Sequence, residues 1–190
     1  MTAMSWPDHL LTLEEFDRLP EDNSRRYELQ EGLLQVSPKA AAVHQRVVKR
    51  ITSSLDEQLP SKWEALQDVE VALDARFPPT LRIPDVVLAP TMAFDANPNR
   101  LYANDVAVAV EVVSPGSGRI DRLMKVHEYA QAGIQHYWIL DIDSSVTISA
   151  LRLHDGAYAS CFEGGGMFKT TDPFELAVDL SALAVRSPER

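Results

Sequence analysis

One acidic residue, Glu111, lies within a run of β-branched and small apolar residues, Asp105 to Val113, that reads D-V-A-V-A-V-E-V-V. This composition is typical of a strand that is buried on both faces. A carboxylate in such a strand destabilises the fold unless a cation or a ligand compensates its charge. We therefore interpret Glu111 as a functional residue.

A second acid and a lysine occupy positions from which they could join Glu111. Asp85 follows Pro84 immediately before a short apolar strand, Val86 to Ala89. Because proline is tolerated at the start of a strand but not within its ladder, Asp85 is expected at a strand margin. Lys125 lies in a predicted helix four residues after Asp121, so the two share a helix face. The plain alternative for Asp121 and Lys125 is an ion pair on the protein surface.

Two carboxylates and a lysine match the requirements of a hard divalent cation, which prefers oxygen ligands and keeps several waters. Held by Asp85 and Glu111, such a cation could bind a phosphate oxygen and lower the pKa of an attacking water. Lys125 could orient that water or stabilise the negative charge that develops. The sequence contains neither a G-x-S-x-G motif nor a Cys–His arrangement that would indicate a nucleophilic enzyme.

The elements that must position these residues are predicted from hydrophobic periodicity and turn residues. The pattern predicts a mixed α/β fold, with a mixed central sheet flanked by helices and extra β-hairpins. The predicted helices are Thr12 to Leu19 with a Thr12–Glu15 capping box, Ala40 to Leu59, and Arg119 to Ala132 ending at Gly133. The predicted strands and hairpins are Arg26 to Pro38 turning at Glu31-Gly32, Trp63 to Leu73, Val86 to Ala89, Asp105 to Val113, Ile134 to Asp141, and Ser145 to Phe162 turning at Asp155-Gly156.

Two periodic patterns predict which side chains face the core. In the strand of Glu111, alternation places the small residues Ala107 and Ala109 on the face of the acid and Val106, Val108, Val110 and Val112 on the other face. In the helix from Ala40 to Leu59, one apolar stripe is formed by Val43, Val47, Val48, Ile51, Leu55 and Leu59. The segment from Thr91 to Asn104 has no clear period and is expected to be a loop. Phe174 to Leu183 is expected to hold a short strand and a turn, followed by a frayed tail.

Length and composition restrict the class of protein. The 190 residues suffice for one domain, with a core of about residues 12–153 and C-terminal hairpins and tail over 154–190. The single cysteine, Cys161, excludes an intrachain disulfide and a cysteine-rich zinc site. The net charge of −10 argues against a broad electrostatic grip on nucleic acid but leaves room for a local basic groove. With neither a membrane span nor a signal peptide in the pattern, a cytoplasmic location is expected.

Five segments also occur in an order that is specific as a set, although each alone is a weak signal. Together they resemble the putative restriction endonucleases of the PD-(D/E)XK nuclease superfamily, a bacterial group once classed as a domain of unknown function. The resemblance covers roughly Thr12 to Leu153. The segments are R-Y-E-L-Q-E-G (26–32), S-P-K-A-A-A-V-H-Q (37–45), P-D-V-V-L (84–88), E-V-V-S-P (111–115) and Y-A-Q-A-G-I-Q-H-Y-W-I-L-D (129–141).

The resemblance implies a restriction-endonuclease-like core and a metal-dependent endonuclease that hydrolyses DNA. Asp85 and Glu111 would bind Mg²⁺ or Mn²⁺, and Glu28 would be an additional acidic residue of the site. The usual lysine of the superfamily lies two residues after the strand acid, where this chain has Val113. The resemblance makes Lys125, in the following helix, the counterpart of that lysine. Supporting positions would be Asp121, Ser114, His44 and Gln45.

The same residues also fit other interpretations. Glu28 could be an exposed strand residue, and His44 alone could cap or pack rather than bind a ligand. The whole chain could be a nuclease fold kept for nucleic-acid or protein interaction without cleavage, which the acidic composition favours. Paired acids also occur in glycosidases, but this chain lacks the aromatic-rich composition of a sugar cleft. DNA is the expected partner, and a homodimer is plausible for an enzyme that cuts duplexes.

Overall fold

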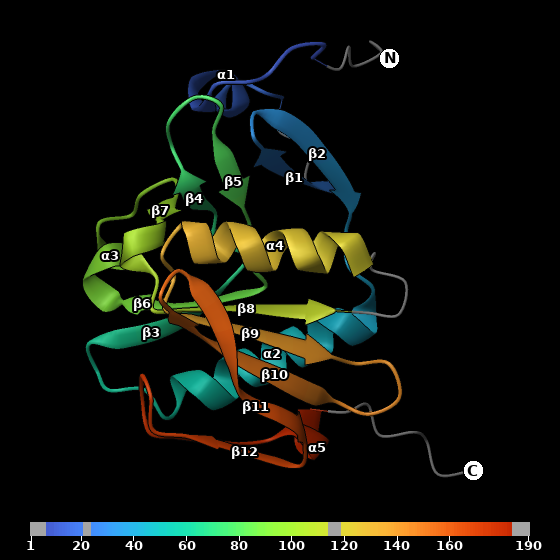
Figure 1. Ribbon diagram of the computed structural model, residues 1–190, viewed down its shortest axis with the longest axis vertical. Helices are drawn as coiled ribbons and strands as arrows, with labels where there is room; N and C mark the ends of the chain where they lie inside the picture. The colour runs from blue at the N-terminus through green and yellow to red at the C-terminus, as the bar shows by residue number, and fades with distance from the viewer. Residues whose placement is uncertain (1–6, 21–23, 114–118, 184–190) are drawn as a thin grey trace.

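The computed structural model describes residues 7–20, 24–113 and 119–183, which build two main sheets with helices packed around them (Figure 1). The larger sheet has six strands in the order β11-β10-β9-β8-β6-β3, and only the β8–β9 pair is parallel. Its strands are β3 (Trp63–Gln67), β6 (Val86–Pro90), β8 (Val108–Val113), β9 (His136–Asp141), β10 (Thr147–His154) and β11 (Ala157–Gly165). The predicted mixed sheet is therefore confirmed.

The second sheet has five strands in the order β2-β1-β5-β4-β7, and a two-stranded sheet pairs β12 with β13. The strands of these sheets are β1 (Arg25–Gln30), β2 (Leu33–Pro38), β4 (Val71–Asp74), β5 (Thr80–Arg82), β7 (Leu101–Tyr102), β12 (Met167–Thr170) and β13 (Leu176–Asp179). The helices are α1 (Leu13–Asp17), α2 (Ala42–Asp56), α3 (Thr91–Asp95), α4 (Arg119–Gln131) and α5 (Leu180–Leu183), and a 3-10 turn, η1, spans Ala103–Asp105. None of the helices in these described segments is long and apolar enough to cross a membrane.

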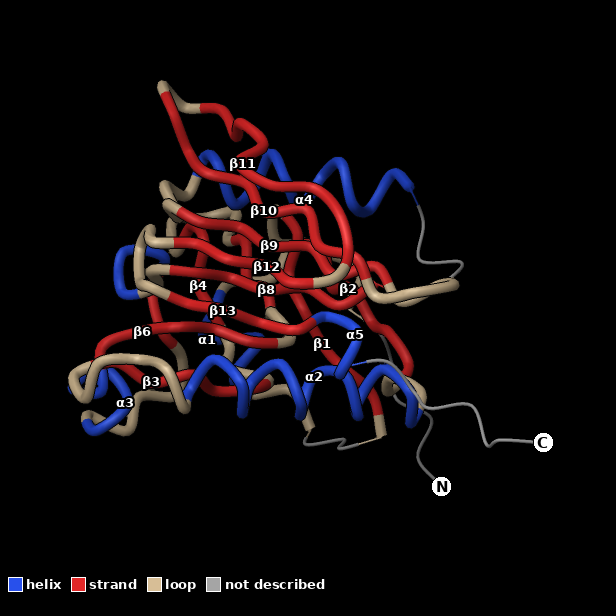
Figure 2. Tube along the Cα trace, turned by 90° about the horizontal axis from the view of Figure 1, so that it is seen from below, coloured by secondary structure: helices blue, strands red, loops and turns tan. Residues whose placement is uncertain are grey.

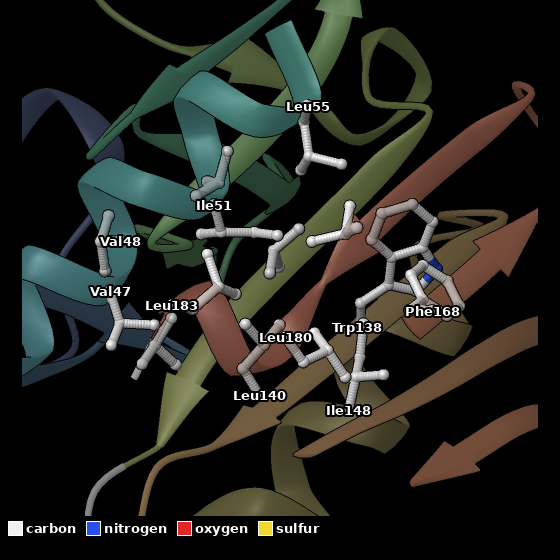
Figure 3. Close-up of a cluster of buried hydrophobic side chains, with 14 of the residues drawn as sticks. Val47, Val48, Ile51, Leu55, Trp138, Leu140, Ile148, Phe168, Leu180 and Leu183 are labelled. Atoms are coloured by element: carbon white, nitrogen blue, oxygen red, sulfur yellow. The ribbon is translucent and has the colours of Figure 1, made fainter. Parts of the chain in front are cut away.

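Helices α2 and α4 lie on opposite faces of the six-stranded sheet (Figure 2). The α2 side forms the main core, in which the helix packs against the valine face of β8 and against β9, β10 and the C-terminal elements (Figure 3). Its buried members include Val47, Val48, Ile51, Leu55, Val108, Val110, Val112, Trp138, Phe168 and Leu183. On the other side, Tyr129 of α4 packs in a cluster with Ala109 of β8. The small face of β8 therefore leaves room for side chains of α4.

The connection from β8 through α4 to the parallel strand β9 returns the helix over the sheet. Gly133 ends this helix with φ +82°, a conformation that other residues rarely adopt. The capping box of Thr12 and Glu15, the hairpin turn at Glu31-Gly32 and the turn at Asp155-Gly156 are likewise confirmed. These local signals are strong because each depends on a few adjacent residues.

Two expectations about elements were wrong, and one strand was not predicted. Trp63 to Leu73 is not one strand, because Asp68 adopts φ +54° and divides it into β3 and β4, which join different sheets. The expected loop from Thr91 to Asn104 contains α3 and β7. The strand β5, which precedes Asp85, was not predicted, because three residues are too few for a period to be recognised.

Two side chains also differ from the predicted core pattern. Val43 is 45% exposed, because it lies in the first turn of α2, beyond the residues of that stripe that pack in the core. Val106 packs in the cluster of Ala109 rather than with the valine face, because regular alternation begins only at Val108 after η1. The expected C-terminal tail, Arg186 to Arg190, lies outside the described residues.

Candidate active site

The acids Asp85 and Glu111 meet at the junction of β6 and β8. In the antiparallel register Val86 pairs with Val110 and Val87 with Ala109, so that one further step places Asp85 opposite Glu111. Asp85 Oδ2 accepts a hydrogen bond of 2.7 Å from the Val112 N–H. Asp85 thus takes the position of a backbone partner at the strand end, as expected for an acid at a strand margin. Asp85 and Glu111 are 1% and 5% exposed.

The Asp85 carboxylate is held at its other oxygen by Arg26 and His44. Arg26 Nη1 and His44 Nε2 each lie 3.1 Å from Asp85 Oδ1. Burial by itself would raise the pKa of Asp85, but the hydrogen bond and charge of His44 and the charge of Arg26 hold that pKa below its ordinary value. Asp85 is therefore ionised, and His44 Nε2 is the donor of their hydrogen bond. Arg26 also bonds the Ile83 carbonyl oxygen at 3.3 Å and pairs with Asp68.

The Glu111 carboxylate faces α4, which supplies two donors from consecutive turns. Lys125 Nζ lies 2.9 Å and the Tyr129 hydroxyl 3.1 Å from Glu111 Oε1. Burial raises the pKa of Glu111 to about 7; Lys125 opposes this rise, and the charges of Asp85 and Glu28 add to it. Burial and the nearby Glu111 carboxylate raise the pKa of Tyr129 well above its ordinary value, so its hydroxyl stays a donor.

Glu28 belongs to a buried ion-pair network next to these acids and is not an exposed strand residue. Its Oε1 accepts a hydrogen bond of 2.9 Å from the Ile83 N–H, and its Oε2 lies 3.3 Å from Arg82 Nη1. Arg82 is 2% exposed and also forms two bonds, of 2.8 and 2.7 Å, with the Glu128 carboxylate. This arginine links β1 and β5 to α4. Glu28 therefore adds negative potential near Glu111 without a bond to it.

The remaining predicted residues differ in burial and in their contacts with the acids. His44 is 8% exposed and bonded to Asp85, whereas Gln45 is exposed on the surface of α2. Lys125 is no solvated surface residue, because its side chain is only 12% exposed. Ser114 and the side chain of Asp121 lie outside the described residues.

Four residues of this arrangement were not predicted from the sequence: Arg26, Arg82, Glu128 and Tyr129. A signal existed for Tyr129, which stands one helical turn after Lys125 and opens the last segment of the family resemblance. Arg26 likewise opens the first segment. No local signal indicates Arg82 or Glu128, because their partners lie 54 and 46 residues away in the sequence.

The donor chemistry of this site fits a hard divalent cation. Asp85, just before β6, and Glu111 of the neighbouring β8 offer carboxylate oxygens, and their mutual repulsion contributes to the raised pKa of Glu111, which a cation would relieve. Within the part of the chain that the structure describes, no three His, Cys, Asp or Glu side chains are arranged to hold a metal. Two protein carboxylates completed by water and substrate oxygens suit Mg²⁺, which usually keeps several waters, and do not suit structural Zn²⁺.

Comparisons with known proteins agree with this fold. A solved structure from Anabaena variabilis, described as "a putative nuclease belonging to DUF820", superimposes with a TM-score of 0.70 at 19% sequence identity, over 91% of this chain and 97% of that chain. At this identity the likeness establishes a common fold. No curated protein matched the chain. The sequence model of the family Uma2, "Putative restriction endonuclease", matches residues 13–182. The chain therefore belongs to the Uma2 family of putative restriction endonucleases.

Proposed function

We propose that the protein is an endonuclease that uses Mg²⁺ or Mn²⁺ to hydrolyse phosphodiester bonds of DNA. The observation that carries this proposal is the meeting of two buried carboxylates, Asp85 and Glu111, with the Lys125 amine 2.9 Å from Glu111. Membership of a family described as "Putative restriction endonuclease" and the fold shared with a putative nuclease support it.

In this proposal Asp85 and Glu111 hold the metal ion. The ion, when bound, polarises a phosphate oxygen and lowers the pKa of a water molecule. His44 and Arg26 keep Asp85 ionised, which a metal ligand must be. Tyr129 and Lys125 orient the Glu111 carboxylate by bonding the same oxygen.

Lys125 has the second role of stabilising charge at the phosphate. Its ammonium is largely desolvated beside Glu111, and charge stabilisation is strongest where water is excluded. The Arg82–Glu128 pair holds α4 against β5 and thereby positions Lys125, one turn earlier on the same helix. This arrangement replaces the superfamily lysine, whose position is filled by the buried Val113.

The proposal is tested by incubating supercoiled plasmid DNA with the protein and Mg²⁺ or Mn²⁺. Nicked and linear products should form, and EDTA should abolish them. Glu111→Gln and Asp85→Asn should be inactive while folded. Glu163→Gln, which removes an exposed carboxylate on β11, serves as the matched control and should be fully active. Full activity of either site variant would refute the assignment of the metal ligands.

A second candidate function is binding of nucleic acid or protein without cleavage. It is favoured by one observation: protein donors already engage both Asp85 oxygens and one Glu111 oxygen, so that a metal would have to compete with Arg26, His44 and Lys125. Titration calorimetry with Mn²⁺ separates the two candidates. A stable complex with DNA and no heat of metal binding would favour the second.

A further inference from the structure

A groove with a volume of about 640 Å³ opens beside the candidate active site. Arg26 connects the two, because it lines the groove and also bonds Asp85 Oδ1 at 3.1 Å. The groove runs between α1, the start of β1 and the start of α2. Its volume is in the range of pockets that bind small molecules, and it is too confined to receive the full width of a duplex. It therefore suits one or two nucleotide units.

Two cations at the open end of the β1–β2 hairpin line this groove. Arg25 pairs with Pro38 in the strand register, so Lys39, the next residue, lies beside Arg25. Both side chains are exposed, and neither forms an ion pair with any residue that the structure describes. Arg25 also lines a second hollow, together with Leu34 and Val36 of β2.

The acidic residues of the groove do not neutralise these cations. Asp68 pairs with Arg26, and Glu70 lies 3.3 Å from Arg100. Arg25 and Lys39 therefore supply two uncommitted positive charges in a protein whose net charge is −10. In such a protein, phosphate can be attracted only where cations are gathered locally.

Apolar side chains also line the groove. Phe16 and Leu19 from α1 and its end, and Tyr27 from β1, line it, and Gln45 adds a polar side chain from α2. A sugar or an unpaired base can lie against such side chains, as in sites for single-stranded nucleic acid. The bases of a duplex are stacked within the helix and could not reach them.

We propose that this Arg25–Lys39 groove binds an unpaired segment of the substrate strand next to the bond to be cleaved. Arg25 and Lys39 contact its phosphates, and the apolar side chains contact a sugar or base. The inference rests on the proposed nuclease function and deepens it, because it assigns the substrate a single-stranded segment and a path to Asp85 past Arg26.

The test measures binding of a short fluorescein-labelled single-stranded oligodeoxynucleotide by fluorescence anisotropy in EDTA, so that no cleavage occurs. The Arg25→Gln/Lys39→Gln variant should bind more weakly than the wild type. Because each phosphate contact on a single strand contributes about 0.7 to the slope of log K against log salt, the slope should fall by roughly 1.4. The duplex of the same sequence should bind more weakly, and the substitutions should change its binding less.

The matched control is Lys62→Gln/Lys169→Gln, which removes two exposed lysines with the same change of net charge. Lys62 follows the C-terminal end of α2 and Lys169 lies on β12, so neither lines the groove. Equal affinity and slope in the two double variants, or an equal effect on the duplex, would overturn the groove assignment. If the wild type still cleaves plasmid DNA in that case, only this inference fails. If the wild type neither binds the oligonucleotide nor cleaves, the proposed function fails with it.

Discussion

Replacing Glu111 by Gln should stabilise the metal-free protein at alkaline pH while removing its activity. The pKa of Glu111 is about 7 in the folded protein, against an ordinary 4.5. Because the folded state binds this proton more tightly than the unfolded state, Glu111 lowers stability as pH rises from about 4.5 through 7. The difference in pKa corresponds to roughly 3 kcal/mol. Gln cannot ionise, so the gain in the free energy of unfolding should be below about 1 kcal/mol at pH 5 and reach roughly 3 kcal/mol above pH 8.

The assay is urea denaturation of the wild type and Glu111→Gln in EDTA at pH 5 and pH 8, with Glu163→Gln as the control for loss of an exposed carboxylate. The quantity compared is the difference in the free energy of unfolding between variant and wild type at each pH, because other groups also titrate. Saturating Mg²⁺ at pH 8 should then raise the stability of the wild type, by about 2.7 kcal/mol at one hundred times its Kd, and leave the variant unchanged. A variant that is less stable than the wild type at pH 8 would refute the claim that Glu111 is held ionised at a cost to the fold.

Three further substitutions probe the surroundings of the acids. Lys125→Met should retain Mn²⁺ binding by calorimetry but lose roughly 10²–10³-fold in kcat, the usual loss for a charge-stabilising donor; full activity would exclude its role at the phosphate. Arg82→Met leaves the buried Glu28 and the half-buried Glu128 without their cation, so urea denaturation should show a loss of roughly 3–5 kcal/mol; an unchanged midpoint would contradict the network. Tyr129→Phe removes a hydrogen bond to the Glu111 carboxylate, and the loss of stability, about 1.5–3 kcal/mol, should be larger at pH 8 than at pH 5; an equal loss at both would show that the bond does not depend on the charge.

The local order of the chain could largely be predicted from its sequence. Alternation placed Glu111 on the small face of its strand, and the Pro84-Asp85 pair indicated a strand margin. The end of the helix that follows was predicted correctly from Gly133. Each of these features depends on neighbours within a few residues. The division of Trp63 to Leu73 at Asp68 could not be predicted, because it depends on which sheet each half joins.

The partners of the acids could be predicted only in part. Lys125 was expected near Glu111 because a helix that follows a strand folds back over it. Arg26 and Arg82 were missed, because the register between β1 and β5 that brings them to the site is a long-range pairing with a single registered residue pair, Leu29 with Leu81. Such buried arginines leave no pattern in the sequence around them. They can be predicted only once the positions of the carboxylates that they neutralise are known.

Metal binding by Asp85 and Glu111 is tested most directly by locating Mn²⁺ from its anomalous scattering in crystals soaked with the ion. We predict one strong peak between β6 and β8, coordinated by a carboxylate oxygen of Asp85 and one of Glu111, with the peak absent from crystals of Glu111→Gln. Saturating Mn²⁺ with no peak at these carboxylates, and their bonds to Arg26 and Lys125 intact, would contradict this prediction.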